Sequence, residues 1–434
     1  MPPIQDHPLR YQLANELHAR PFPSLKAPCR AVYLAIKKAQ DASSRDRAKD
    51  LAHLIALLDR YGTQHPQPGA THFTAAIGQH VLKWEQHTEF VSYTVFLAGL
   101  GERPFDPADF DVFPDDWLES APGVRVTSAM IRICERADHD ADVNLLANAW
   151  LVTESMAVSS VLDDAMIVAG DFRIDQGGHL RFAVFPRRGV GERRVGRVVQ
   201  RLCEIETYKA MSMLGFTRVR AIAGRMTEID EELTRLMTAM THGDAPEEET
   251  LTALLRVSSE LETLSAQTAF RLSATEAYEA LVTQRIAVLR EERCGGRQTF
   301  REFMARRFDP AMRTVKSAEK RLESMSARAV RAGDLLRTRV EVKRSAQNQD
   351  LLESMNHRAD LQLRLQHTVE GLSVVAISYY AVSLVGYLLY PLADVIGMSK
   401  GMLTALAVPP VVLAVWLGLR RIRSAVEKDG HQPR

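Results

Sequence analysis

The pattern of hydrophobic and polar positions changes twice along the chain, near residue 186 and again near residue 371. Up to residue 186, short runs rich in β-branched and aromatic residues alternate with turns, as in "THFTAAIG", "HVLKWEQH" and "FVSYTVFLAG". Successive runs of this kind are typical of an antiparallel meander. "CRAVYLAI" predicts a buried strand, and "SRDRAKDLAHLIALLDRYG" predicts a helix that ends at Gly62. We therefore predict an α+β domain over residues 1–186 with a mostly antiparallel sheet.

The second part of the chain has helical periodicity and almost no strand pattern. The run "DAPEEETLTALLRVSSELETL" places Pro246 and three glutamates in its first turn, where proline and negative charge are favoured. Asp309 has the position of an N-cap, and Pro310 that of a first-turn proline. No further proline occurs up to Tyr390. We therefore predict helical arms over residues 187–309, followed by one long helix.

An a/d-like apolar seam runs along the first part of this long helix. Its members are Val315, Leu322, Met325, Ala329, Ala332 and Leu336. The seam stops at Arg339 and Lys343 and returns with Leu352, Met355 and Ala359. Such a seam is buried only when other helices pack along it. We therefore predict a stalk helix over residues 310–370 that makes coiled-coil contacts.

The third pattern is continuously apolar. Residues 371–392 form a run of 22 residues without a charge, about 33 Å long as a helix and enough to cross a bilayer core. After a loop, 393–401, a second run of 18 residues covers 402–419, and a basic tail, 420–434, ends the chain. A buried core hairpin is the alternative. The adjacent charge-free runs and the "RRIR" that follows them favour a two-helix transmembrane hairpin.

Basic residues flank this hairpin on one side. Arg364 precedes the first run, and Arg420, Arg421 and Arg423 follow the second, whereas the loop holds one Asp and one Lys. The positive-inside rule then places both termini in the cytoplasm and the loop outside. The first residues show no apolar segment typical of a secretory signal. We expect an inner-membrane protein, in contact with the lipid bilayer, whose residues 1–370 face the cytoplasm.

The charge is balanced overall but segregated along the chain. The net charge of +1 lacks the basic excess of a nucleic-acid-binding protein, so we expect no nucleic-acid partner. Residues 227–262 hold ten acidic and two basic side chains, whereas residues 305–345 hold twelve basic and five acidic ones. An acidic arm packed against a basic stalk explains this segregation, and so do two separately solvated faces.

The stretch "NELHARPF" is the first candidate site. It brings Glu16, His18 and Arg20 close together in sequence, just before a proline that disfavours helix at Arg20. The cluster could bind an anion or pass a proton. Alternatively, His18 and Arg20 cap the carbonyl groups at a helix end, and this interpretation is favoured because no nucleophile or second carboxylate lies nearby in sequence.

A second candidate is the arginine-rich stretch "RRGVGERRVGR". Arg187, Arg188 and Arg193 surround a predicted helix start, where an anion could bind. The stretch is neither a Walker loop nor a dinucleotide-binding motif. No GxSxG, HExxH or Cys/His nucleophile pattern occurs anywhere in the chain. We therefore predict no catalytic residue, no enzymatic activity and no cofactor.

Metal binding has little support in the sequence. His65, His72, His80 and His87 recur across the predicted meander, and adjacent strands could bring two or three of them together. Their spacing matches no ligand motif, and the four cysteines form no CxxC pair and are typical of reduced thiols. We therefore predict no metal site.

A polar stripe lies within the first apolar run. Its members fall on one helical face and are Ser373, Tyr380, Ser383, Tyr387 and Tyr390. Such a stripe can line a pore. It can also pack against the second run, with the last two tyrosines at the membrane interface, and this alternative is favoured.

Three features together resemble a known bacterial family of membrane-anchored proteins, domain of unknown function 3422. They are the "NELHARPF" segment, the "LCEIETYKAMSMLG" helix (residues 202–215) and the C-terminal hairpin. The resemblance covers essentially the whole chain. It implies a location and an architecture but no activity.

The layout is also similar to that of CorA-type magnesium channels. These proteins combine a cytoplasmic α/β domain, helical arms, a long stalk helix and two spans, with Gly-Met-Asn after the first span. Gly397, Met398 and Ser399 stand at that place here, so serine replaces the ion-facing asparagine, and Lys400 follows at once. A lysine there would repel cations, so selectivity does not carry over.

These observations lead to one expectation and two alternatives. We expect a membrane-anchored, non-enzymatic protein that acts through an unknown protein partner or through self-association as a homo-oligomer. The first alternative is a CorA-like divalent cation channel or transporter with the first span lining the pore. The second is a membrane-tethered enzyme, which would require the N-terminal histidines or Glu16, His18 and Arg20 to converge in a pocket.

Overall fold

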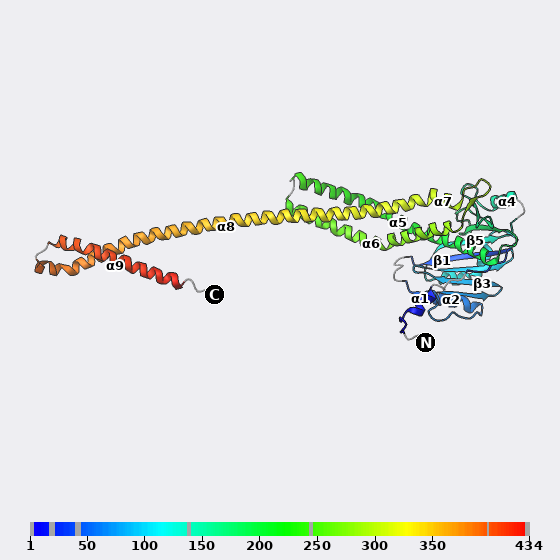
Figure 1. Ribbon diagram of the computed structural model, residues 1–434, viewed down its shortest axis with the longest axis horizontal. Coiled ribbons are helices and arrows are strands. Elements are labelled where there is room, and N and C mark those ends of the chain that lie inside the picture. The colour runs from blue at the N-terminus through cyan, green and yellow to red at the C-terminus, as the bar shows by residue number, and fades with distance from the viewer. Residues whose placement is uncertain are drawn as a thin grey trace. The chain divides into compact units, whose positions relative to one another are not determined.

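The computed structural model describes residues 4–16, 22–39, 45–136, 140–242, 246–396 and 399–429. The chain divides into two compact units, Met1–Gly333 and Asp334–Arg434, and each is described by itself. Helix α8 (Asp309–Ile396) contributes to both units. Figure 1 labels the helices and strands.

Among the described residues, nine strands form one mixed sheet in the first unit, in the order β2-β3-β4-β1-β5-β8-β7-β6-β9. The strands are β1 (Cys29–Lys37), β2 (His72–Ile77), β3 (His80–Gln86), β4 (Phe90–Ala98), β5 (Val124–Ile133), β6 (Ala157–Val161), β7 (Met166–Gly170), β8 (Leu180–Pro186) and β9 (Glu292–Arg293). Neighbouring strands are antiparallel except for β5 and β8, which are parallel. The predicted α+β unit with a mostly antiparallel sheet is confirmed.

The predicted meander is β2-β3-β4, and "CRAVYLAI" forms the central strand β1 between β4 and β5. The parallel β5–β8 pair was not expected. It arises because the chain leaves β5 through helix α4 (Asp140–Trp150) and the β6–β7 hairpin before it returns as β8. Strand β9 was also missed. It is only two residues long and pairs with β6 after a long helical excursion.

Each face of the sheet is covered by helices. Val32, Leu34 and Trp84 belong to a core that includes helix α2 (Arg47–Arg60), the 3-10 helix η2 (Pro107–Val112), helix α3 (Asp115–Glu119) and α4. Ala31 and Tyr33 face the opposite core. That core contains residues of α5 (Glu192–His242), α6 (Glu247–Ala287), α7 (Phe300–Arg307) and the start of α8.

Helices α5 and α6 pack side by side over most of their lengths (Figure 1). A Cβ added at Gly215 would overlap the side chain of Thr275, so the glycine lets the two helices approach closely at this point. Helix α6 ends at Ala287. Arg225 of α5 forms a two-pronged ion pair with Glu260 of α6, with N–O distances of 2.5 and 2.7 Å.

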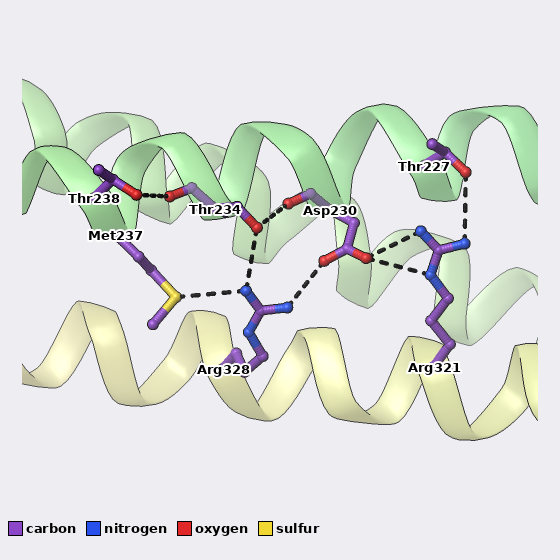
Figure 2. A network of polar contacts seen from close by, with 7 residues as sticks. All are labelled: Thr227, Asp230, Thr234, Met237, Thr238, Arg321 and Arg328. Carbon is purple, nitrogen blue, oxygen red and sulfur yellow. Dashed lines mark hydrogen bonds and ion pairs between the residues drawn. The ribbon is translucent and has the colours of Figure 1, made fainter.

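In the apolar seam of the long helix, Leu352, Met355 and Ala359 are exposed, whereas the first part of the seam is buried as predicted. All six of its members, Val315, Leu322, Met325, Ala329, Ala332 and Leu336, are buried. The acidic arm also contacts the basic stalk, because Asp230 of α5 pairs with both Arg321 and Arg328 of α8, at 3.0 and 2.9 Å (Figure 2). Other acidic side chains of this arm pair instead with arginines of α5 and α6, as Glu260 does with Arg225 and Glu232 with Arg256.

The second unit contains the rest of α8 and helix α9 (Lys400–Asp429), which folds back beside the end of α8 (Figure 1). Two helices are long and apolar enough to cross a membrane, and only 11% and 0% of their apolar windows are buried in the structure. They therefore do not form the buried core hairpin that was the alternative. Gly386 and Ser378 of α8 are buried on the face toward α9.

A short N-terminal helix, α1, spans Arg10–Glu16. Leu9 just before it and Leu13 within it are exposed, so these leucines do not attach the helix to the sheet. His18 and Arg20 lie outside the described residues, as does the side chain of Glu16. The predicted helix cap at "NELHARPF" therefore stays a prediction.

Candidate functional site

Residues 22–25 lie directly beside the first turns of α5. The backbone N–H of Leu25 donates to the carbonyl of Glu192 at 3.1 Å, and the Ser24 hydroxyl donates to the Glu192 carboxylate at 2.9 Å. The Arg197 guanidinium lies 5.1 Å from the centre of the Phe22 ring. Phe22, the last residue of "NELHARPF", is thus held against the start of α5.

Gly196 makes this contact possible. A Cβ at this position would overlap the carbonyl oxygen of Pro23. Glycine costs about 1 kcal/mol relative to alanine inside a helix. Its presence in the first turns of α5 is therefore explained by the close approach of the Pro23 backbone.

Just beyond Pro23, a small hollow lies between α5 and strands β1, β3 and β4. Its polar lining includes Tyr33, Lys83, Glu85, Gln200 and Glu204, and we refer to these five residues as the polar cleft. Lys83 and Glu85 alternate with Leu82 and Trp84 along β3, so the charged pair faces α5 while the apolar pair joins the other core.

Polar contacts cross the cleft in an unbroken chain from β3 to α6. The Lys83 ammonium lies 3.1 Å from the Glu85 carboxylate and donates to the Gln200 side-chain oxygen at 2.7 Å. The Gln200 amide donates to Glu204 at 2.8 Å, and Arg285 of α6 pairs with the same carboxylate. Because the charges alternate in sign, each buried ion has a compensating partner.

Deeper in the cleft, the hydroxyl groups of Tyr33 and Thr207 are 2.7 Å apart, and Thr207 also donates to the carbonyl of Cys203. Burial raises the pKa of Tyr33 well above its ordinary value, so the phenol stays protonated. Burial likewise raises the pKa of the Cys203 thiol. A thiol in this state is not an activated nucleophile.

A second set of buried ion pairs lies on the same face of the sheet. Glu89 pairs with Arg271 of α6, and Glu206 of α5 pairs with Lys209 at 2.7 Å. Burial, and then the positive charge of Arg271, lowers the pKa of Lys37 nearby. This half of the sheet is thus joined to α5 and α6 by charged and hydroxyl groups as well as by apolar packing.

The size of the cleft limits its chemistry. It has room for little more than one water molecule, whereas pockets for small-molecule substrates occupy roughly 300–1,000 Å³. Among the described residues, no group of three His, Cys, Asp or Glu side chains could hold a metal ion. The geometry is that of a closed polar joint between the sheet and the helical arms.

The arginines of the second sequence candidate do not gather around one anion. Arg187 pairs with Asp164, and Arg188 lies 3.5 Å from Glu135. Arg193 is exposed on the first turn of α5. The sequence signal for the polar cleft was missed, although Lys83 and Glu85, spaced by two in a predicted strand and alternating with Leu82 and Trp84, indicate a strand face that meets charged groups.

Comparison with known proteins gives one match. The sequence model of one protein family matches residues 5–426, and this family is described as "Protein of unknown function (DUF3422)". The chain belongs to this family. No curated protein and no solved structure matches. Cys203, Glu204 and Thr207 of "LCEIETYKAMSMLG" line the polar cleft together with Pro23, which directly follows "NELHARPF".

The polar stripe of the first apolar run lies in the second unit of this DUF3422 protein. Tyr380 and Tyr387 expose 68% and 71% of their surfaces in the single chain. Ser373 is exposed and Ser383 is half-buried, and the Ser383 hydroxyl donates to the carbonyl of Tyr379. The side chain of Tyr390 lies outside the described part.

Proposed function

We propose that this DUF3422 protein is a membrane-anchored, non-enzymatic protein that self-associates and whose N-terminal unit acts in the cytoplasm through an unidentified protein partner. One observation carries the proposal. Every residue from 341 to 369, between the buried part of α8 and its apolar run, is exposed in the single chain. A helix of this length needs partners to be stable in water.

Membrane anchoring is supported by the surface of the last two helices. Leu388 and Leu406 expose 75% and 73% of their surfaces, and many other large apolar side chains around them are exposed as well. Soluble monomers rarely expose contiguous apolar patches of more than a few hundred Å². A bilayer would cover these side chains. We place the hairpin in the inner membrane. The arginines after the second run would then put both termini in the cytoplasm.

Self-association is supported by the pattern of the exposed stretch. Leu351, Met355, Leu365, Val369 and Leu372 follow the heptad spacing i, i+4, i+14, i+18, i+21, and the first four expose half or more of their surfaces. Helices anchored in the same membrane run in the same direction, so a second copy would meet this seam in parallel. Arg358 and Gln362 occupy the intervening seam positions, where polar residues set register at a cost in stability.

Cysteine cross-linking in membranes tests this arrangement. With an oxidant, Leu351→Cys on the seam should form a disulfide-linked dimer, whereas Glu353→Cys on the opposite face should not. Deletion of residues 371–434 should move the protein to the soluble fraction. Equal cross-linking of both variants would refute the seam, and retention of the truncated chain in carbonate-washed membranes would refute the anchor.

A CorA-like cation channel is the second candidate function. It is supported by the exposed tyrosines Tyr380 and Tyr387, which would face a neighbouring copy or a central axis if the chain formed a ring. Reconstitution into liposomes loaded with a Mg²⁺-sensitive dye tests it. Flux that falls on Tyr387→Trp substitution would favour the channel, and flux no greater than in empty liposomes would exclude it.

A further inference from the structure

In the second unit, α8 and α9 enclose a groove where the apolar run of α8 begins and that of α9 ends. The groove is open to solvent and has a volume of about 770 Å³, within the roughly 300–1,000 Å³ of a typical small-molecule pocket. Its lining changes character along its length. Gln366, His367, Glu370 and Arg420 lie at one end, and Val374 and Leu419 line the part within the apolar runs.

Arg420 supplies positive charge at the polar end. Its guanidinium lies 5.1 Å from the centre of the Trp416 ring, and in the described part of the chain no carboxylate lies within ion-pair distance of it. The carboxylate in the groove, Glu370, is engaged elsewhere. The Gln366 amide donates to it at 3.3 Å, and His367 lies 3.8 Å away.

We propose that this groove binds an anionic phospholipid. The lipid phosphate would accept hydrogen bonds from Arg420, and an acyl chain would lie along Val374 and Leu419. The inference rests on the proposed membrane anchoring, which puts Arg420 at the level of the lipid headgroups and Trp416 one turn deeper, where amphipathic rings are favoured.

The polarity of the groove selects a lipid over other occupants. A free phosphate ion would satisfy Arg420 but leave the apolar half of the groove uncovered. A second copy of α8 would place the exposed apolar face of a helix against Gln366, His367 and Arg420. A phospholipid matches both ends, because it carries its negative charge and its hydrocarbon on the same molecule.

Quenching of Trp416 fluorescence by brominated lipids provides the test. The full chain is placed in nanodiscs that contain brominated phosphatidylglycerol or brominated phosphatidylcholine at equal mole fraction. The signal of a Trp416→Phe variant is subtracted, because Trp84 and Trp117 are buried in the first unit and Trp150 also lies there. We expect the groove to bind the anionic lipid roughly fivefold more tightly than the zwitterionic lipid, because one basic side chain near an anionic membrane surface has an effect of this size.

Arg420→Gln should abolish this preference, and the charge-matched control Arg421→Gln, which does not line the groove, should retain it. Equal quenching by the two lipids, or equal loss in both variants, would overturn the inference. Competition by added inorganic phosphate would assign the site to free phosphate instead. Nanodiscs that hold the protein without any quenching would show that a second copy covers the groove. Failure of the chain to enter nanodiscs would refute the membrane anchoring itself.

Discussion

Lys83 on β3 donates a hydrogen bond of 2.7 Å to the side-chain oxygen of Gln200 on α5. The two residues are 117 positions apart in sequence, and the contact joins the sheet to the helix that begins the arms. Only 5% of the Lys83 side chain and 10% of the Glu85 side chain are exposed. A buried ion pair of this kind is weak evidence for stability but makes each partner dependent on the other.

Removing one member of this pair should destabilise the first unit strongly. Lys83→Met leaves the Glu85 carboxylate buried without its cation, and we expect a loss of about 3–5 kcal/mol in the free energy of unfolding. The double variant Lys83→Met, Glu85→Leu should recover most of this loss because neither charge is then left unpaired. Urea unfolding of the parent protein, the single variant and the double variant checks it, and a double variant no more stable than Lys83→Met would contradict the coupling.

Gly196 should not tolerate a side chain. Gly196→Ala forces a methyl group into the Pro23 carbonyl, and we expect a cost of about 1–3 kcal/mol, typical of overpacking. Gly224 in the same helix is a matched control, because nothing lies within 4 Å of an added Cβ there. Gly224→Ala should stabilise the helix by roughly 0.5–1 kcal/mol. Thermal unfolding distinguishes the two, and an equal effect at both sites would show that Pro23 does not pack against α5.

Asp230 should make the junction of α5 and α8 sensitive to acid. Burial raises the pKa of this carboxyl, but hydrogen bonds from Arg321 and Arg328 outweigh burial, and the net pKa is lowered. A depressed folded-state pKa stabilises the protein above the unfolded value of about 3.9. That contribution is lost as the pH falls through the lower folded value.

Asp230→Asn should therefore be less stable than the parent protein at neutral pH, by about 1 kcal/mol because the site is partly exposed. The difference between the two proteins should shrink as the pH falls below about 4. Denaturant titrations at several pH values measure it. A difference that stays constant down to the lowest pH would show that the carboxylate charge does not contribute.

Charge on the exposed seam of α8 should block self-association. Leu365→Glu places a carboxylate at a position that the proposed second copy would bury, so the oligomer should dissociate in detergent while the first unit stays folded. Glu353→Gln on the opposite face is the control and should leave assembly unchanged. Analytical ultracentrifugation in detergent measures this, and an oligomer unaffected by Leu365→Glu would place the contact elsewhere.

Local patterns were sufficient to predict the strands of the meander, the long helix and the buried first part of its seam. The β-branched and aromatic residues of "HVLKWEQH" predicted β3, and the lack of proline after Pro310 predicted α8, because each signal lies within the segment itself. The seam from Val315 to Leu336 followed from heptad spacing alone.

Contacts between distant segments could not be predicted in the same way. The parallel β5–β8 pair depends on where the chain returns after α4, and the Lys83–Gln200 contact depends on how α5 lies across the sheet. Leu352 shows the opposite failure, since heptad spacing predicted that the seam returns there, whereas the structure leaves this leucine exposed. Periodicity shows that a helix has an apolar face but not what covers it.

The mass of the full chain in detergent micelles, measured by light scattering with the detergent contribution subtracted, tests the central claim most directly. Self-association along the exposed stretch of α8 predicts a protein mass that is a whole-number multiple of 48.5 kDa, twofold or more. A mass of 48.5 kDa at all concentrations would mean that residues 341–369 stay exposed without a second copy, and it would contradict the proposed self-association.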